Sequence, residues 1–124
     1  MNKTDRNIVF NVVSEFYSKI RKDDMLGPIF NKTVKDWDTH LELITDFWMN
    51  SIHLKGNYIG NPVKKHIEVD KFCSHAITQN HFAQWLNIWS ETCDENLEKE
   101  LAFSLKNKAR KMSTMLFINI FQNR

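Results

Sequence analysis

The stretch NIVFNVVSEFYSKI, residues 7–20, sets the pattern that runs through the whole chain. Its large apolar side chains recur every three or four residues: Val9, Val12, Val13, Phe16, Tyr17 and Ile20. Side chains with that spacing share one face of an α-helix, so the stretch predicts an amphipathic helix that faces a core. Thr4 is a suitable N-cap for this helix. The charges of RKDDMLGPIF (21–30), followed by Gly27-Pro28, predict its end.

The same period continues towards the end of the chain. We expect a second helix from about Lys35 to Leu54 and a third from about Thr78 to Leu97. The charged segment 94–100 allows a break, after which a final helix carries the stripe Leu101, Leu105, Ala109, Met112, Leu116 and Ile120. Only three glycines and two prolines interrupt the chain, which is too few for an all-β protein. The sequence therefore predicts an all-α fold of four long helices and one short one.

The short helix is expected behind the main loop, KGNYIGNPV (55–63). Asn61 fits an N-cap, and Pro62 fits the first helical position, where its missing N–H costs nothing. His66 then lies one turn after Pro62 on the same face. Taken alone, this position favours a partly exposed histidine over a ligand-binding one.

Composition excludes several classes of protein. A chain of 124 residues predicts a single domain, 1–124, with one core. The 17 basic residues are nearly balanced by 15 acidic ones and are spread along the chain, which argues against a nucleic-acid partner. No run reaches the roughly 18 apolar residues of a membrane helix. The first residues lack the apolar region of a signal peptide, so we expect a cytoplasmic protein.

The two cysteines and five histidines form no recognised catalytic or zinc motif. Cys73 and Cys93 lie outside any CxxC or CxxCH pattern, which predicts reduced thiols and excludes covalently attached c-type haem. HEXXH, Walker A and GxGxxG sequences are absent. Cys73 with His75 is a weak candidate metal pair, and Cys93 reads as a small core residue. The 15 aromatic residues suit either a bulky core or the wall around a flat apolar ligand.

Several segments, in order and at consistent spacing, resemble the group III truncated haemoglobins. The resemblance covers about Phe16 to Met115 and is carried by FYSKIRKDDMLGPIF (16–30), Trp37 with His40 and DFW (46–48), YIGNPVKKH (58–66) and HFAQWLNIWSET (81–92). The glycine pairs typical of groups I and II are absent, as they are in group III.

The resemblance implies a two-over-two helical sandwich around haem b. It implies that His66 is the proximal iron ligand and that Tyr17, His40 and Trp85 lie on the distal side. Side chains expected against the haem are Phe16, Phe30, Ile44 and Phe47. Lys64 and Lys65 either reach the haem propionates or form a solvated face.

The resemblance further implies reversible binding of O₂, and of NO and CO. A diatomic ligand that gains negative charge from ferrous iron would accept hydrogen bonds from the Tyr17 hydroxyl and the Trp85 indole. Two donors suit tight holding better than bulk oxygen transport. We expect His40 to control access, to act as a third donor or to be a bystander, rather than to ligate iron. The alternatives are NO dioxygenase or peroxidase-like chemistry, which needs an external reductase, and a haem-free helical interaction module.

Overall fold

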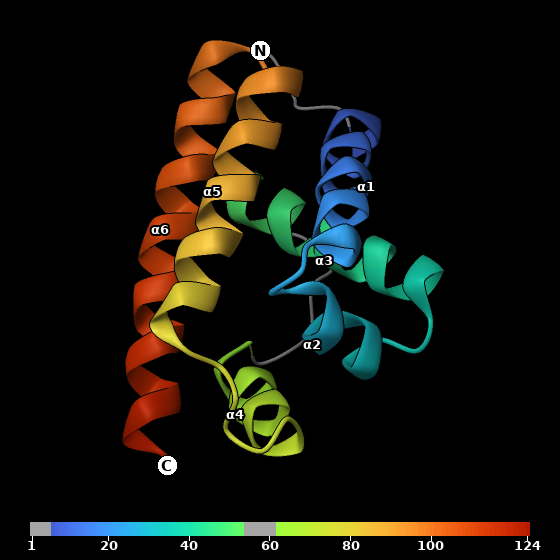
Figure 1. The fold of residues 1–124 in the computed structure, drawn as a ribbon. Coiled ribbons are helices and arrows are strands. Elements are labelled where there is room, and N and C mark those ends of the chain that lie inside the picture. The colour runs from blue at the N-terminus through green and yellow to red at the C-terminus, as the bar shows by residue number, and fades with distance from the viewer. Residues whose placement is uncertain (1–5, 54–61) are drawn as a thin grey trace.

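The computed structural model describes residues 6–53 and 62–124, and the regular elements within these ranges are all helices (Figure 1). They are α1 (Arg6–Lys22), α2 (Gly27–Thr33), α3 (Trp37–His53), α4 (Pro62–Phe72), α5 (Gln79–Asn96) and α6 (Lys99–Gln122). The predicted all-α fold is confirmed.

Two pairs of helices form the body of the molecule. The long helices α5 and α6 lie side by side, α1 packs against α3, and the two pairs meet where α1 contacts α5 (Figure 1). This is the two-over-two arrangement. The shorter helices are attached at the edges, with α2 against α1 and α4 against the far end of α6.

The core lies where α1, α3, α5 and α6 meet, and indole rings fill its centre. Trp89 of α5 is fully buried and stacks on Trp48 of α3, with ring centroids 4.8 Å apart. On the other side Trp85 stacks on Trp89 at 6.3 Å. We call Trp48, Trp89 and Trp85 the indole column. The predicted stripe of residues 7–20 packs around it, and all six of its named side chains are buried.

The long helices begin close to the predicted residues, and local capping explains their limits. The helix expected from Lys35 begins at Trp37, because the Asp36 carboxylate accepts hydrogen bonds from the Thr39 N–H at 3.1 Å and hydroxyl at 2.7 Å. The helix expected from about Thr78 begins at Gln79, because Thr78 caps α5 in a reciprocal capping box with His81. The predicted caps Thr4 and Asn61 lie outside the described residues.

The helix α2 was missing from the sequence prediction, which read Gly27-Pro28 only as a break. Asp23 shapes the turn before it by accepting hydrogen bonds from the N–H groups of Met25 and Leu26, at 3.0 and 2.9 Å. Pro28 then lies in the first turn of α2, where a proline favours a helix start. Gly27-Pro28 therefore marks the start of α2 as well as a break in the helical pattern. Within the described residues, no helix is long and apolar enough to cross a membrane.

Candidate functional site

Tyr17 occupies the centre of a group of rings drawn from three helices. It lies on α1, is 5% exposed, and contacts Phe30 of α2 and Trp37 and His40 of α3, with ring centroids 5.7, 5.5 and 5.2 Å away. Burial raises the pKa of its hydroxyl well above the usual range. Tyr17 therefore stays protonated at physiological pH and can donate a hydrogen bond.

His40 lies edge-on to Tyr17 and also to Trp37, whose ring centroid is 5.5 Å away. Its Nε2 atom is buried and has no hydrogen-bond partner in the part of the chain that the structure describes. Burial, and then the charge of His66, lower the pKa of His40, which keeps the imidazole neutral near pH 7. A buried polar atom without a partner is costly, and such atoms mark places where a further group can bind.

Trp85 of α5 joins this group through Phe16. The Phe16 ring is 4.9 Å from Tyr17 and 5.5 Å from Trp85, and it meets both edge-on. Trp89 donates its indole N–H to the Leu105 carbonyl at 3.3 Å and is thereby committed to the core. Trp85, one turn earlier, is only half-buried. We call Phe16, Tyr17, Trp37, His40 and Trp85 the aromatic cluster.

His66 approaches this cluster from a separate helix. It lies half-buried in the middle of α4, and its charge reaches His40 of α3. Two histidines far apart in sequence are thus brought within electrostatic reach of each other. The helix α4 extends to Phe72, further than the short PVKKHIE helix that was predicted, so His66 has helical turns on both sides.

The predicted wall residues belong to the hydrophobic core or pack against it. Phe16 is buried, and Phe30, Ile44 and Phe47 are partly buried against the core. Lys64 and Lys65 are exposed on α4. The structure brings Tyr17, His40 and Trp85 into one cluster and places His66 within electrostatic reach of His40, whereas the roles of these residues towards a ligand stay predictions.

The geometry can now be compared with known proteins. No family model matches the chain. The chain is 31% identical to the group 3 truncated hemoglobin ctb of Campylobacter jejuni over 103 residues, which cover 80% of this chain and 77% of the relative. The chain belongs to the group III truncated haemoglobins. The crystal structure of a group III truncated hemoglobin from Campylobacter jejuni superposes with a TM-score of 0.86 at 25% identity, covering 100% of this chain and 97% of that one. Membership makes this truncated haemoglobin a haem-binding globin.

The residues of this truncated haemoglobin fit such a group. Haem is a flat apolar plate whose iron takes a neutral imidazole on one face. The half-buried His66 carries an imidazole, and the rings of the aromatic cluster are largely apolar. His40 Nε2 and the protonated Tyr17 hydroxyl supply polar atoms in a largely apolar setting.

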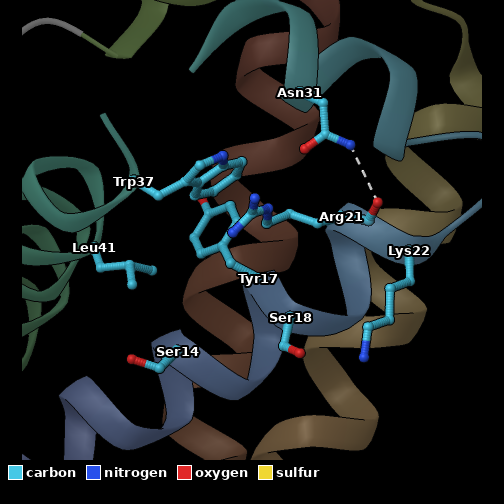
Figure 2. Close-up of a pocket in the computed structure, with 8 residues that line it drawn as sticks. All are labelled: Ser14, Tyr17, Ser18, Arg21, Lys22, Asn31, Trp37 and Leu41. Atoms are coloured by element: carbon cyan, nitrogen blue, oxygen red, sulfur yellow. Dashed lines mark hydrogen bonds between the residues drawn. The ribbon is translucent and has the colours of Figure 1, made fainter. Parts of the chain in front are cut away.

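A separate depression in this globin is lined in part by Tyr17 (Figure 2). Its volume is about 450 Å³, and it is lined by Ser14, Tyr17, Ser18, Arg21, Lys22, Asn31, Trp37 and Leu41. The Arg21 guanidinium lies 4.6 Å from the centre of the Trp37 ring. The lining does not include His40, Trp85 or His66, so we do not identify this depression with the haem site.

Sequence reasoning gave Trp37 no part in the site, although its ring contacts both Tyr17 and His40 at 5.5 Å. The available signal was its position three residues before His40, on the same helical face.

Cys73 and His75, the weak candidate metal pair, each contact another side chain. His75 Nδ1 lies 3.0 Å from an Asp70 carboxylate oxygen, and Cys73 Sγ lies 4.0 Å from the Thr33 hydroxyl. Burial raises the pKa of the Cys93 thiol to about 12, as suits an inert core residue.

Proposed function

We propose that this globin holds haem b through His66 and binds O₂, and also NO and CO, on the opposite face, where Tyr17 and Trp85 restrain the ligand. The observation that carries the proposal is the contact of buried, protonated Tyr17 with His40, whose Nε2 is unpartnered among the described residues and whose pKa is lowered in part by His66. The absence of a CxxCH motif supports non-covalent haem b. When bound, ferrous haem supplies the site at which diatomic ligands bind reversibly.

Tyr17 would act as the principal donor. Its hydroxyl is kept protonated by burial, and its ring is fixed by Phe16, Phe30 and Trp37, which limits the entropy lost when it donates. A hydrogen bond to a charged acceptor contributes about 1.5–3 kcal/mol, which slows dissociation on the order of ten- to a hundredfold. Trp85 would act as the second donor, because an indole N–H donates hydrogen bonds and does not accept them.

His40 would act as a neutral side chain that controls access. Its lowered pKa keeps one ring nitrogen without a proton near pH 7. Because His40 lies against both Tyr17 and Trp37, a rotation of the imidazole would open or close the approach to the Tyr17 hydroxyl. Lys64 and Lys65, exposed on the helix that carries His66, are suited to pair with the haem propionates.

The test is the rate of O₂ dissociation from the ferrous protein, measured by stopped flow with CO as the replacing ligand. We expect Tyr17→Phe and Trp85→Phe to release O₂ faster, on the order of tenfold or more for Tyr17→Phe. Trp48→Phe is the matched control, because it makes the same indole-to-phenyl exchange at the other end of the indole column. Unchanged rates in both Tyr17→Phe and Trp85→Phe would remove the donor account.

A second measurement separates holding from turnover. The oxygenated protein is mixed with NO in a single turnover, and separately the ferric protein is mixed with peroxide. Slow reaction in both supports ligand holding. Rapid loss of NO with formation of nitrate would move the function to NO dioxygenation, which needs an external reductase to return the iron to the ferrous state. The buried, unpaired Cys73 and Cys93 support a reducing compartment, for which we propose the cytoplasm.

A further inference from the structure

A buried carboxylate lies near the end of the helix that carries His66. Asp70 lies in the last turns of α4, one helical turn after His66 on the same face, and is only 2% exposed. Both of its oxygens are used by Arg124, with Nη2 to Oδ1 at 2.8 Å and Nε to Oδ2 at 3.0 Å. His75 Nδ1 lies 3.0 Å from Oδ2. The two-point contact between the Arg124 guanidinium and the Asp70 carboxylate fixes both their distance and their relative orientation.

Arg124 also contacts groups other than Asp70. Its Nη2 also donates to the carbonyls of His75 at 3.1 Å and Ile77 at 2.5 Å, and its guanidinium lies 4.0 Å from the centre of the Phe121 ring. One side chain therefore joins the end of α6, the end of α4 and the turn between α4 and α5. We call Asp70, His75 and Arg124 the Asp70 clamp.

The turn inside this clamp has an unfavourable backbone. Ser74 and His75 have φ angles of 58° and 60°, a left-handed conformation that costs free energy for residues other than glycine. Such residues persist where surrounding contacts compensate for them. The His75 N–H donates to the Asp70 carbonyl at 2.7 Å, and the His75 carbonyl accepts from Arg124. The clamp is thus made of contacts that hold the turn in this single conformation.

The carboxylate is charged at neutral pH. Burial works to raise the pKa of Asp70, but the hydrogen bonds from Arg124 and His75 outweigh it and hold the pKa below its usual range. A buried ion pair contributes less to net stability than its contacts suggest, because both charges lose their hydration. What it provides is one defined arrangement of the elements it joins. Here those elements are α4 and α6, which also pack against each other.

We propose that Arg124 is a positioning residue for His66, and that through Asp70 it fixes the rotation and depth of α4 against the end of α6. The inference rests on the proposed function, because it takes His66 as the haem-binding histidine. Groups that hydrogen-bond directly to a metal-binding histidine change the affinity about 10- to 100-fold when they are lost. Arg124 acts one step further away, through Asp70 and α4, so we expect the lower end of that range.

The test compares Arg124→Ala and Arg124→Lys with Arg110→Ala. Arg110 is exposed on α6, the helix that Arg124 follows, and among the described residues its side chain donates to the Asn107 side chain of the same helix at 2.8 Å. Its removal makes the same change in charge. Amide hydrogen exchange is measured on the apoprotein, helix by helix. Haem loss from the ferric holoprotein to an excess of apomyoglobin is measured separately. Asp70→Asn, which keeps the shape of the side chain, is a second variant should Arg124→Ala fail to fold.

We expect Arg124→Ala to exchange faster in α4, with α1 and α5 unchanged, and to lose haem on the order of tenfold faster than Arg110→Ala. Arg124→Lys should be intermediate, because a lysine contacts the carboxylate at one point only. The inference is wrong if α4 exchange in Arg124→Ala equals that in Arg110→Ala, if all helices accelerate together, or if haem loss does not change. If the parent protein takes up no hemin, the proposed function fails, while the α4 exchange still decides whether the clamp holds α4.

Discussion

The two histidines of the site are held in different ways. His40 belongs to the aromatic cluster, whose rings come from α1, α3 and α5 and rest on the indole column of the core. His66 lies on α4, which is attached at the edge of the fold and fastened by the Asp70 clamp. His40 is thus held by tight packing of apolar side chains, whereas the helix of His66 is held by a few directional polar contacts. Damage to the core should therefore change the structure around His40 most, and loss of one charge in the clamp should change the position of α4.

Trp89→Ala should produce the largest loss of stability. The indole is fully buried between Trp48 and Trp85, so truncation leaves a cavity and costs about 3–5 kcal/mol in the free energy of unfolding. Urea unfolding of the apoprotein measures it. Trp89→Phe should lose less, because a phenyl ring still fills part of the space while the hydrogen bond to the Leu105 carbonyl is gone. A loss below about 1 kcal/mol in Trp89→Ala would show that the column does not support the cluster.

Gly27→Ala should have a smaller effect, confined to the region of the aromatic cluster. A Cβ at this position would lie 2.8 Å from the Arg21 backbone carbonyl oxygen, so α2 would have to shift away from α1. Such overpacking costs about 1–3 kcal/mol. The shift would also move Phe30 away from Tyr17. Thermal unfolding measures the stability change, and Pro28→Ala at the exposed neighbouring position is the control. An equal change in both variants would contradict the close approach at Gly27.

The pH dependence of stability should show the smallest effect. Burial and then His66 lower the folded-state pKa of His40, so below about pH 6.5 the unfolded chain binds a proton that the folded chain does not. The free energy of unfolding should therefore fall as the pH drops from 7 to 5. Urea unfolding at both pH values should show a smaller fall in His40→Gln.

His81 is the internal comparison for this effect. Burial lowers its pKa as well, although Asp23 opposes the shift, so His81→Gln should also flatten the profile while leaving O₂ kinetics unchanged. A parent protein whose stability is the same at pH 7 and pH 5 would contradict the assignment of His40 as a buried neutral imidazole.

The sequence predicted well what depends on repeated apolar spacing. The stripe from Val9 to Ile20 is buried as expected, and α5 begins at the Thr78 cap. The resemblance named Tyr17, His40 and Trp85, which the fold brings into one cluster with Phe16.

Contacts between polar residues far apart in the sequence could not be predicted from apolar spacing. Asp70 and Arg124 are charged residues, which are usually solvated, and nothing in their spacing marks them as a buried pair. The helix α2 was missed for a related reason. Gly27-Pro28 signals both a stop and a start, and only the Asp23 turn decides that a new helix follows.

The central claim is that His66 is the residue that holds the haem. Its most direct test is titration with hemin of the parent protein, His66→Gly and His81→Ala, followed by the Soret absorbance. We expect one equivalent of hemin to bind tightly to the parent and to His81→Ala. His66→Gly should lose tight binding and regain it when free imidazole is added, because imidazole can occupy the place of the missing side chain. A parent protein that develops no Soret band, or a His66→Gly variant that binds hemin as tightly as the parent without imidazole, would contradict the account.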